Sequence, residues 1–128
     1  MAREPFQYTV IRIVPRIERE EFVNAGVILF CRTRGFLGAR VALHPERIAA
    51  LAPGAELTGV QEYLDAIVRV AAGDPAAGSI AALSQSERFG WLAAPSSTVV
   101  QTSPIHTGLS EDPEATLERL FEQLVRAR

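Results

Sequence analysis

Only a few side chains in this sequence could carry acid–base or nucleophilic chemistry. The histidines are His44 and His106, and Cys31 is the single cysteine. His106 could exchange protons near neutral pH, and Ser103 and Asp112 are near it in sequence as a nucleophile and an orienting acid. The glycines that surround a serine in a nucleophile elbow are absent. An enzyme using His106 is therefore one hypothesis, and a role in stabilising a turn or contacting a partner is the other.

A charged segment over residues 16–21 is the second candidate. Arg16 and Arg19 alternate there with three glutamates. Arginine forks bind carboxylate or phosphate in a bidentate manner, which favours an anion-binding or partner-binding pole. The alternative is a solvated loop whose charges pair with one another and add little to stability. For residues 16–21 we favour the solvated loop over the binding pole.

Asn24 and Gly26 interrupt the apolar run that follows. A buried amide without hydrogen-bond partners costs about 1–3 kcal/mol, so we expect Asn24 to tie the charged loop to its own sheet. A ligand contact by Asn24 is the alternative. Gly26 permits a β-bulge or a close approach of neighbouring atoms. Cys31, at the end of the run, is expected to be a small buried hydrophobe.

Composition excludes several classes of protein. The sequence has no phosphate-binding glycine loop and no metal-ligand spacing, so we expect neither a cofactor nor a metal. A single cysteine is typical of the reducing cytoplasm. The N-terminus lacks the apolar stretch of a signal peptide, and no apolar run is long enough to span a membrane. The expected location is cytoplasmic.

Charge is unevenly distributed along the chain. All thirteen basic residues are arginine, and the net charge is −2. Residues 1–47 carry eight arginines and five acids, whereas residues 48–128 carry five arginines and ten acids. Nucleic-acid binding needs many phosphate contacts, so it is unlikely in a net-acidic domain. It would require one face to hold the N-terminal arginines, which are Arg12, Arg16, Arg19, Arg32, Arg34 and Arg40.

Hydrophobic periodicity predicts a single α+β domain over residues 1–128. Strands are expected over residues 6–14, 22–31 and 36–43, forming an antiparallel meander whose second strand is covered on both faces. Residues 44–48 are expected to form a loop that leads into a short helix through Leu51. Packed against the sheet, we expect helices over residues 58–72 and 112–127.

Capping signals place the helix ends. Thr58 with Gln61 resembles a capping box for the first long helix, and Asp112 with Pro113 can begin the last one. Asp74 with Pro75 can begin another short helix.

Residues 84–110 have a less decisive pattern. Residues 89–92 suit a strand or a packed loop, residues 97–101 a short strand, and residues 103–108 a turn-rich segment. Trp91 with Phe89 could form a recognition hot spot if exposed, whereas a single tryptophan in so small a domain usually lies in the core.

Three segments together resemble a bacterial family known as domain of unknown function 3037: Tyr8-Thr9-Val10-Ile11-Arg12 with Pro15, Glu21-Phe22-Val23-Asn24-Ala25-Gly26-Val27-Ile28-Leu29-Phe30, and Ser103-Pro104-Ile105-His106-Thr107-Gly108. The likeness covers almost the whole chain, and neither of its most specific segments is a known catalytic signature. The family has no assigned activity. Its members are often encoded beside kinases resembling HipA, the toxin kinase of bacterial persistence modules. The resemblance therefore implies a partner or regulator of such a kinase.

These observations favour a non-catalytic protein that binds another protein. The polar residues least explained by core building are taken as its binding surface: Arg16, Arg19, Asn24, Ser103 and His106, with the rest of the 103–108 segment.

Overall fold

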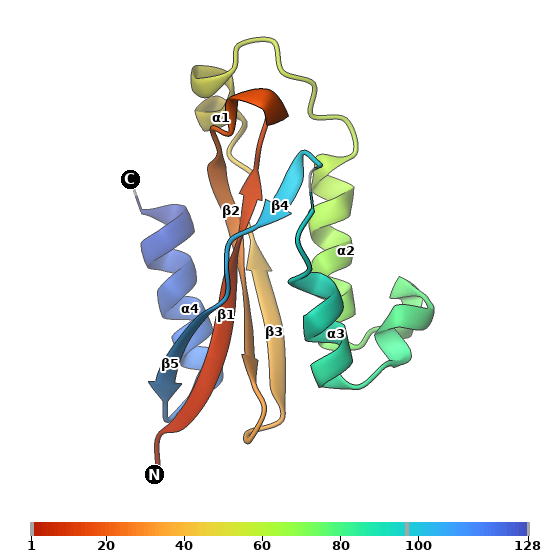
Figure 1. The fold of residues 1–128 in the computed structure, drawn as a ribbon, viewed down its shortest axis with the longest axis vertical. Helices are drawn as coiled ribbons and strands as arrows, with labels where there is room; N and C mark the ends of the chain where they lie inside the picture. Colours follow the sequence, from red (N-terminus) through yellow and green to blue (C-terminus); the bar gives the residue numbers. More distant parts are fainter. Residues whose placement is uncertain (1, 97, 128) are drawn as a thin grey trace.

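Five strands form one antiparallel sheet with β1 at its centre (Figure 1). The computed structural model describes residues 2–96 and 98–127. The predicted meander is confirmed as β1 (Glu4–Ile13), β2 (Val23–Cys31) and β3 (Phe36–Val41). The strand order is β3-β2-β1-β4, and β5 also pairs with β1. The chain is therefore a single α+β domain, as its periodicity predicted.

Two short strands share the outer edge of β1. β4 (Val100–Thr102) pairs with residues 11–13, and β5 (His106–Ser110) pairs with residues 4–8. The expected strand over 97–101 is thus found as β4, with residue 97 outside the described residues. The turn expected over 103–108 is wrong from His106 onward, because that segment gains its strand structure from pairing with β1, about a hundred residues away.

Helices cover both faces of the sheet (Figure 1). α1 (Pro45–Leu51), α2 (Val60–Ala72) and α3 (Gln85–Leu92) pack on one face, and α4 (Pro113–Phe121) with the π-helical turn η4 (Glu122–Arg126) packs on the other. The remaining helical segments are 3-10 turns: η1 (Ile17–Arg19), η2 (Pro75–Ala77) and η3 (Ser79–Ala82). The helices expected over residues 58–72 and 112–127 are confirmed, and the short helix that ends at Leu51 is present but begins at Pro45, within the expected loop.

The helix caps were predicted correctly at some ends only. The Asp112 carboxylate accepts a hydrogen bond from the Ala115 amide, and Asp74 caps η2 in the same manner. The Thr58 prediction is wrong: Gly59 occupies the N-cap position of α2, and the Thr58 hydroxyl donates to Glu56 instead.

Residues 89–92 lie in α3 rather than in a strand or loop. The helix begins at a reciprocal capping box in which the Ser84 hydroxyl accepts from the Glu87 amide and the Glu87 carboxylate accepts from the Ser84 amide. This arrangement satisfies two amides that the first turn leaves free. Phe89 is buried and Trp91 is exposed, so the two aromatic residues do not act together.

The sheet separates two hydrophobic cores. Residues such as Ile11 and Ile28 face α2 and α3, whereas Val27 and Leu29 face α4. β2 is therefore buried on both faces, as its continuous apolar sequence predicted. Cys31 is fully buried at the end of β2, in agreement with its expected role.

Candidate functional site

Ser103 completes the sheet between β4 and β5. Its backbone amide donates to the Val10 carbonyl (2.8 Å), and its hydroxyl accepts from the Val10 amide (2.9 Å) and donates to the Pro104 carbonyl (2.9 Å). Thr9 donates its own hydroxyl to the Ser103 carbonyl at 2.7 Å. Ser103 is buried, so its hydroxyl serves the backbone rather than a ligand.

His106 lies on the exposed part of β5. Its imidazole packs against the Tyr8 ring with the centroids 5.1 Å apart. Within the described ranges, no hydrogen bond or ion pair joins the His106 side chain to another residue. The Asp112 carboxylate caps α4, and the Ser103 hydroxyl is occupied. The three groups of the enzyme hypothesis are therefore not assembled into a catalytic arrangement.

Arg16 and Arg19 lie at the end of the sheet where β1 gives way to η1. The Arg16 guanidinium donates to the Pro53 carbonyl (3.1 Å), and Arg19 forms a bidentate pair with Glu21, the shorter contact being 2.6 Å. The hydrogen bond from Arg19 lowers the pKa of the Glu21 carboxyl, and the same contact raises the pKa of Arg19. Both partners are exposed, so the pair contributes little to stability. The charged segment thus satisfies much of its own charge.

Asn24 ties β2 to the end of the C-terminal helix. Its amide nitrogen donates to the Leu124 carbonyl in η4 at 3.0 Å, rather than to the charged loop as expected. The Asn24 side-chain oxygen is buried without a partner in the described structure. Beside it, the register of β1 and β2 shifts so that Arg12 pairs with Asn24 and Ile11 with Gly26, which places the predicted bulge at Ala25. A Cβ at Gly26 would meet the Arg40 carbonyl at 2.7 Å, which confirms the predicted close approach.

The N-terminal arginines are not gathered in one patch. Arg32 and Arg34 lie at the β2–β3 turn, at the opposite end of the sheet from Arg16 and Arg19. Arg34 donates to the Ala2 carbonyl. The arrangement required for the nucleic-acid hypothesis is therefore not present.

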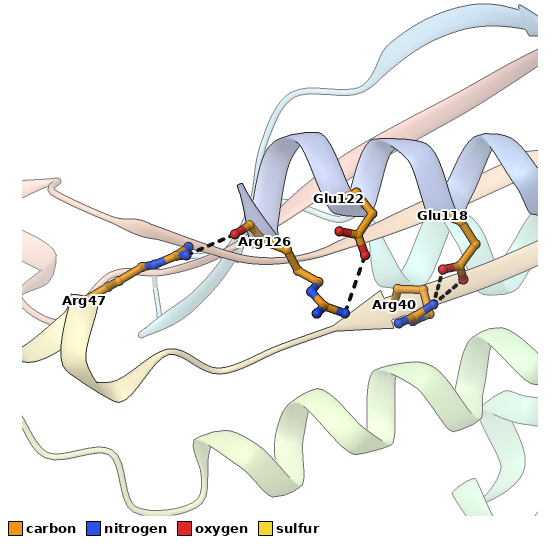
Figure 2. A network of polar contacts seen from close by, with 5 residues as sticks. All are labelled: Arg40, Arg47, Glu118, Glu122 and Arg126. Atoms are coloured by element: carbon orange, nitrogen blue, oxygen red, sulfur yellow. Dashed lines mark hydrogen bonds and ion pairs between the residues drawn. The ribbon is translucent and has the colours of Figure 1, made fainter. Parts of the chain in front are cut away.

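Two arginines hold the C-terminal helix against the rest of the fold (Figure 2). Arg40 of β3 contacts both carboxylate oxygens of Glu118. Arg47 of α1 donates to the Val125 carbonyl at 2.7 Å. It also donates to the Arg126 carbonyl at 3.2 Å, the contact drawn in Figure 2. These guanidinium groups have structural partners in α4 and η4.

Arg12 has a different environment. It follows Tyr8 and Val10 at even spacing along β1, so its side chain lies on the face of the sheet that α4 covers. Its guanidinium lies over the Phe22 ring, 4.1 Å from the centroid. The Arg12 Nε is buried and has no hydrogen-bond partner among the described residues. Arg12 therefore has an aromatic support but no acceptor for this nitrogen.

A surface cavity of about 520 Å³ opens beside this guanidinium. Its lining residues come from β1, the η1 loop and the edge of the sheet: Arg12, Val14, Ile17, Glu20, Phe22, Ser96 and Gln101. Glu20 has a left-handed backbone conformation (φ 57°) at the end of η1. The cavity thus contains one cation, one anion and exposed apolar side chains.

An adjoining cavity of about 250 Å³ lies between α2, α3 and β4. It shares Ser96 and Gln101 with the first cavity, and its lining is mainly apolar. Tyr63 and Trp91 line it and are 51% and 52% exposed. We call the combined region the β4 surface, defined by Arg12, Ile17, Phe22, Tyr63, Trp91 and Gln101.

Sequence reasoning identified this surface only in part. It named Arg12 as a nucleic-acid contact and Trp91 as a hot spot if exposed, and Trp91 is exposed. Phe22 was assigned to the buried strand, but it precedes β2 and is 43% exposed. Tyr63 has the spacing of the apolar stripe of its helix, three residues after Val60 and four before Ile67, so the sequence pattern contains no signal that it is exposed.

The described residues contain no group of three or more histidine, cysteine or acidic side chains placed to hold a metal ion. Across the same residues, every helix is too short or too polar to cross a bilayer.

Comparison with known proteins gives one match. Neither the curated proteins nor the solved structures provide another. The match is to a family described as "Protein of unknown function (DUF3037)", and it spans residues 8–125. The matched range includes β1 from Tyr8 onward and the whole of β2, β3, β4 and β5. It also includes α4 and η4 up to Val125. The chain therefore belongs to the DUF3037 family.

Proposed function

We propose that this protein is a non-catalytic interaction or regulatory partner of another bacterial protein, which binds at the β4 surface. The observation that carries the proposal is that exposed Trp91 and Tyr63 line one of two adjoining cavities at β4, while exposed Phe22 and the partly buried Arg12 line the other. Tryptophan, tyrosine and arginine are the residue types most enriched at binding hot spots. Exposed aromatic side chains beside a shared groove are typical of a surface that a second protein covers.

The family resemblance suggests which partner to test first, a HipA-like kinase encoded nearby. A regulator of such an enzyme needs a surface for docking rather than a reaction centre of its own. The two other hypotheses have weaker geometric support. The His106 ring packs against Tyr8 without a hydrogen-bond partner among the described residues, and Arg16 and Arg19 lie at the opposite end of the sheet from Arg32 and Arg34.

The direct test is co-purification of this protein with the neighbouring kinase. We expect a complex at micromolar concentration, with affinity falling at least about tenfold on Trp91→Ala, because central aromatic anchors cost about 2 kcal/mol or more when truncated. Leu109→Ala is the matched control: Leu109 is 60% exposed but lies on β5, away from the β4 surface. Absence of a complex, or equal losses from the two variants, would contradict the proposal.

A further inference from the structure

We infer that the Arg12 cavity binds the carboxylate of an acidic side chain, presented by the partner's polypeptide between two apolar residues. This inference rests on the proposed function and names the chemistry of the docked segment.

The first support is the uncompensated charge of Arg12. Among the described residues, no carboxylate lies within 4.0 Å of its guanidinium. Phe22 covers one face of the group, and its Nε is shielded from water without an acceptor. Stacking on an aromatic ring leaves the in-plane N–H donors of an arginine for a planar acceptor, and a carboxylate matches this fork.

Arg40 shows what is missing at Arg12. Arg40 also lies over a phenylalanine ring, that of Phe121, at 4.6 Å from the centroid. There, one guanidinium nitrogen, Nη1, contacts both oxygens of Glu118 (Figure 2). The same chain therefore uses a stacked arginine as a carboxylate receptor once, and Arg12 repeats the stack without the carboxylate.

Glu20 sets a limit on what enters the cavity. It lines the same space as Arg12 but does not pair with it in the described structure. An incoming carboxylate must overcome the negative charge of Glu20, and neutralising that charge should favour binding. Removing the charge of Glu20 should therefore change the affinity for a charged ligand more than the affinity for its neutral isostere.

The apolar residues of the two adjoining cavities define the rest of the segment. Ile17 and Phe22 line the Arg12 cavity and are 42% and 43% exposed, whereas the Tyr63–Trp91 cavity, which shares Ser96 and Gln101 with it, lies around the β4 edge toward α2 and α3. A segment that places an acid on Arg12 would place one apolar neighbour on Ile17 and Phe22, and it would reach Tyr63 and Trp91 by passing around β4. The favoured sequence is apolar, acidic, apolar.

The experiment uses N-acetyl-Leu-Asp-Leu-amide and its Asn isostere, titrated into the full chain by NMR. We expect the Asp peptide to shift the Arg12 Nε–H and Trp91 indole signals, with the Asn peptide about tenfold weaker because charge-assisted bidentate bonds are lost. Arg12→Gln should cause a similar loss, and Glu20→Gln should strengthen Asp-peptide binding about twofold to threefold. Arg19→Gln is the matched control, since Arg19 already pairs with Glu21, and it should change nothing.

Equal binding of the two peptides, an unaffected Arg12→Gln variant, or no shift at about 10 mM peptide would overturn the inference. The unmutated chain with the two peptides tests it even if a variant does not fold. Kinase co-purification separates this result from the proposed function. If the peptide arm fails while complex formation still depends on Trp91, the carboxylate assignment is wrong and the partner role stands; if both fail, both are wrong.

Discussion

Two corners of one sheet face contain the same pair of residue types, an arginine over a phenylalanine ring. At the β3–α4 corner, Arg40 lies over Phe121 and contacts Glu118. At the β1–β4 corner, Arg12 lies over Phe22, and no carboxylate of the described chain reaches it. The first corner is closed by a helix, and the second opens into a cavity.

The difference arises from where the C-terminal helix ends. α4 lies along β2 and β3 and supplies both Phe121 and Glu118. η4 ends at Arg126, where Asn24 and Arg47 hold its last carbonyls. Beyond that end, none of the described helices supplies a carboxylate to Arg12 of β1. The same local chemistry is therefore structural where a helix of the fold covers it and available for binding where none of the described helices does.

Replacing each of the two phenylalanines by alanine should give the largest difference in stability between the two corners. Phe121→Ala should lower the free energy of unfolding by about 3–5 kcal/mol, because the ring is 1% exposed and its loss leaves a cavity in the core. Phe22→Ala should lower it by less than about 1 kcal/mol, because that ring is 43% exposed, while weakening partner binding. Urea unfolding of both variants measures this. Similar losses of stability would mean that the two corners are equally structural.

Removing the Ser103 hydroxyl tests whether the open corner rests on a rigid edge. Ser103→Ala should lower the free energy of unfolding by about 1–3 kcal/mol, because the Val10 amide loses its buried acceptor. Thr107→Ala, at an exposed position of β5, serves as the control and should be nearly neutral. If Ser103→Ala leaves the free energy of unfolding unchanged, the sheet edge tolerates the loss of this hydrogen bond. The strand that positions Arg12 would then be held less firmly than we expect.

Replacing each arginine by glutamine should change stability least, and the difference between the two variants tests whether Arg12 has a partner within the fold. Arg40→Gln should cost up to about 1 kcal/mol of stability, as expected for a partly exposed ion pair. Arg12→Gln should cost less, because no carboxylate of the described residues is left unpaired by the change. Thermal unfolding in low and high salt measures both: added salt should narrow the difference between Arg40→Gln and the unmodified chain. A larger loss for Arg12→Gln would contradict the interpretation that its partner is external.

Local sequence patterns predicted the parts of the fold that depend on local interactions. The alternating and continuous apolar runs located β1, β2 and β3, and Asp112 with Pro113 located the start of α4. Ser84 and Glu87 have the capping-box spacing that marks the start of α3, but residues 89–92 were assigned to a strand or a packed loop. β5 was not predictable from local sequence, because its strand structure depends on pairing with β1. Gly108, for example, leaves the space that the Phe6 ring of β1 occupies.

The candidate site was less predictable for a related reason. Ser103 and His106 look reactive in sequence, yet one hydroxyl is used by the backbone of β1 and one imidazole packs on Tyr8. Arg12 looks like one arginine among thirteen until the structure shows which carboxylates have other partners. An unpaired charge is a property of the whole arrangement, so residue types and spacing do not reveal it.

The interruption at Ser103 and Pro104 also affects how this protein meets its neighbours in a crowded solution. An unbroken outer strand would offer a long row of amides and carbonyls on which another chain could build. Here the row is divided into segments of three and five residues, and proline contributes no amide between them. This side of the molecule is therefore protected against fibril-like growth, even though exposed aromatic side chains lie close by.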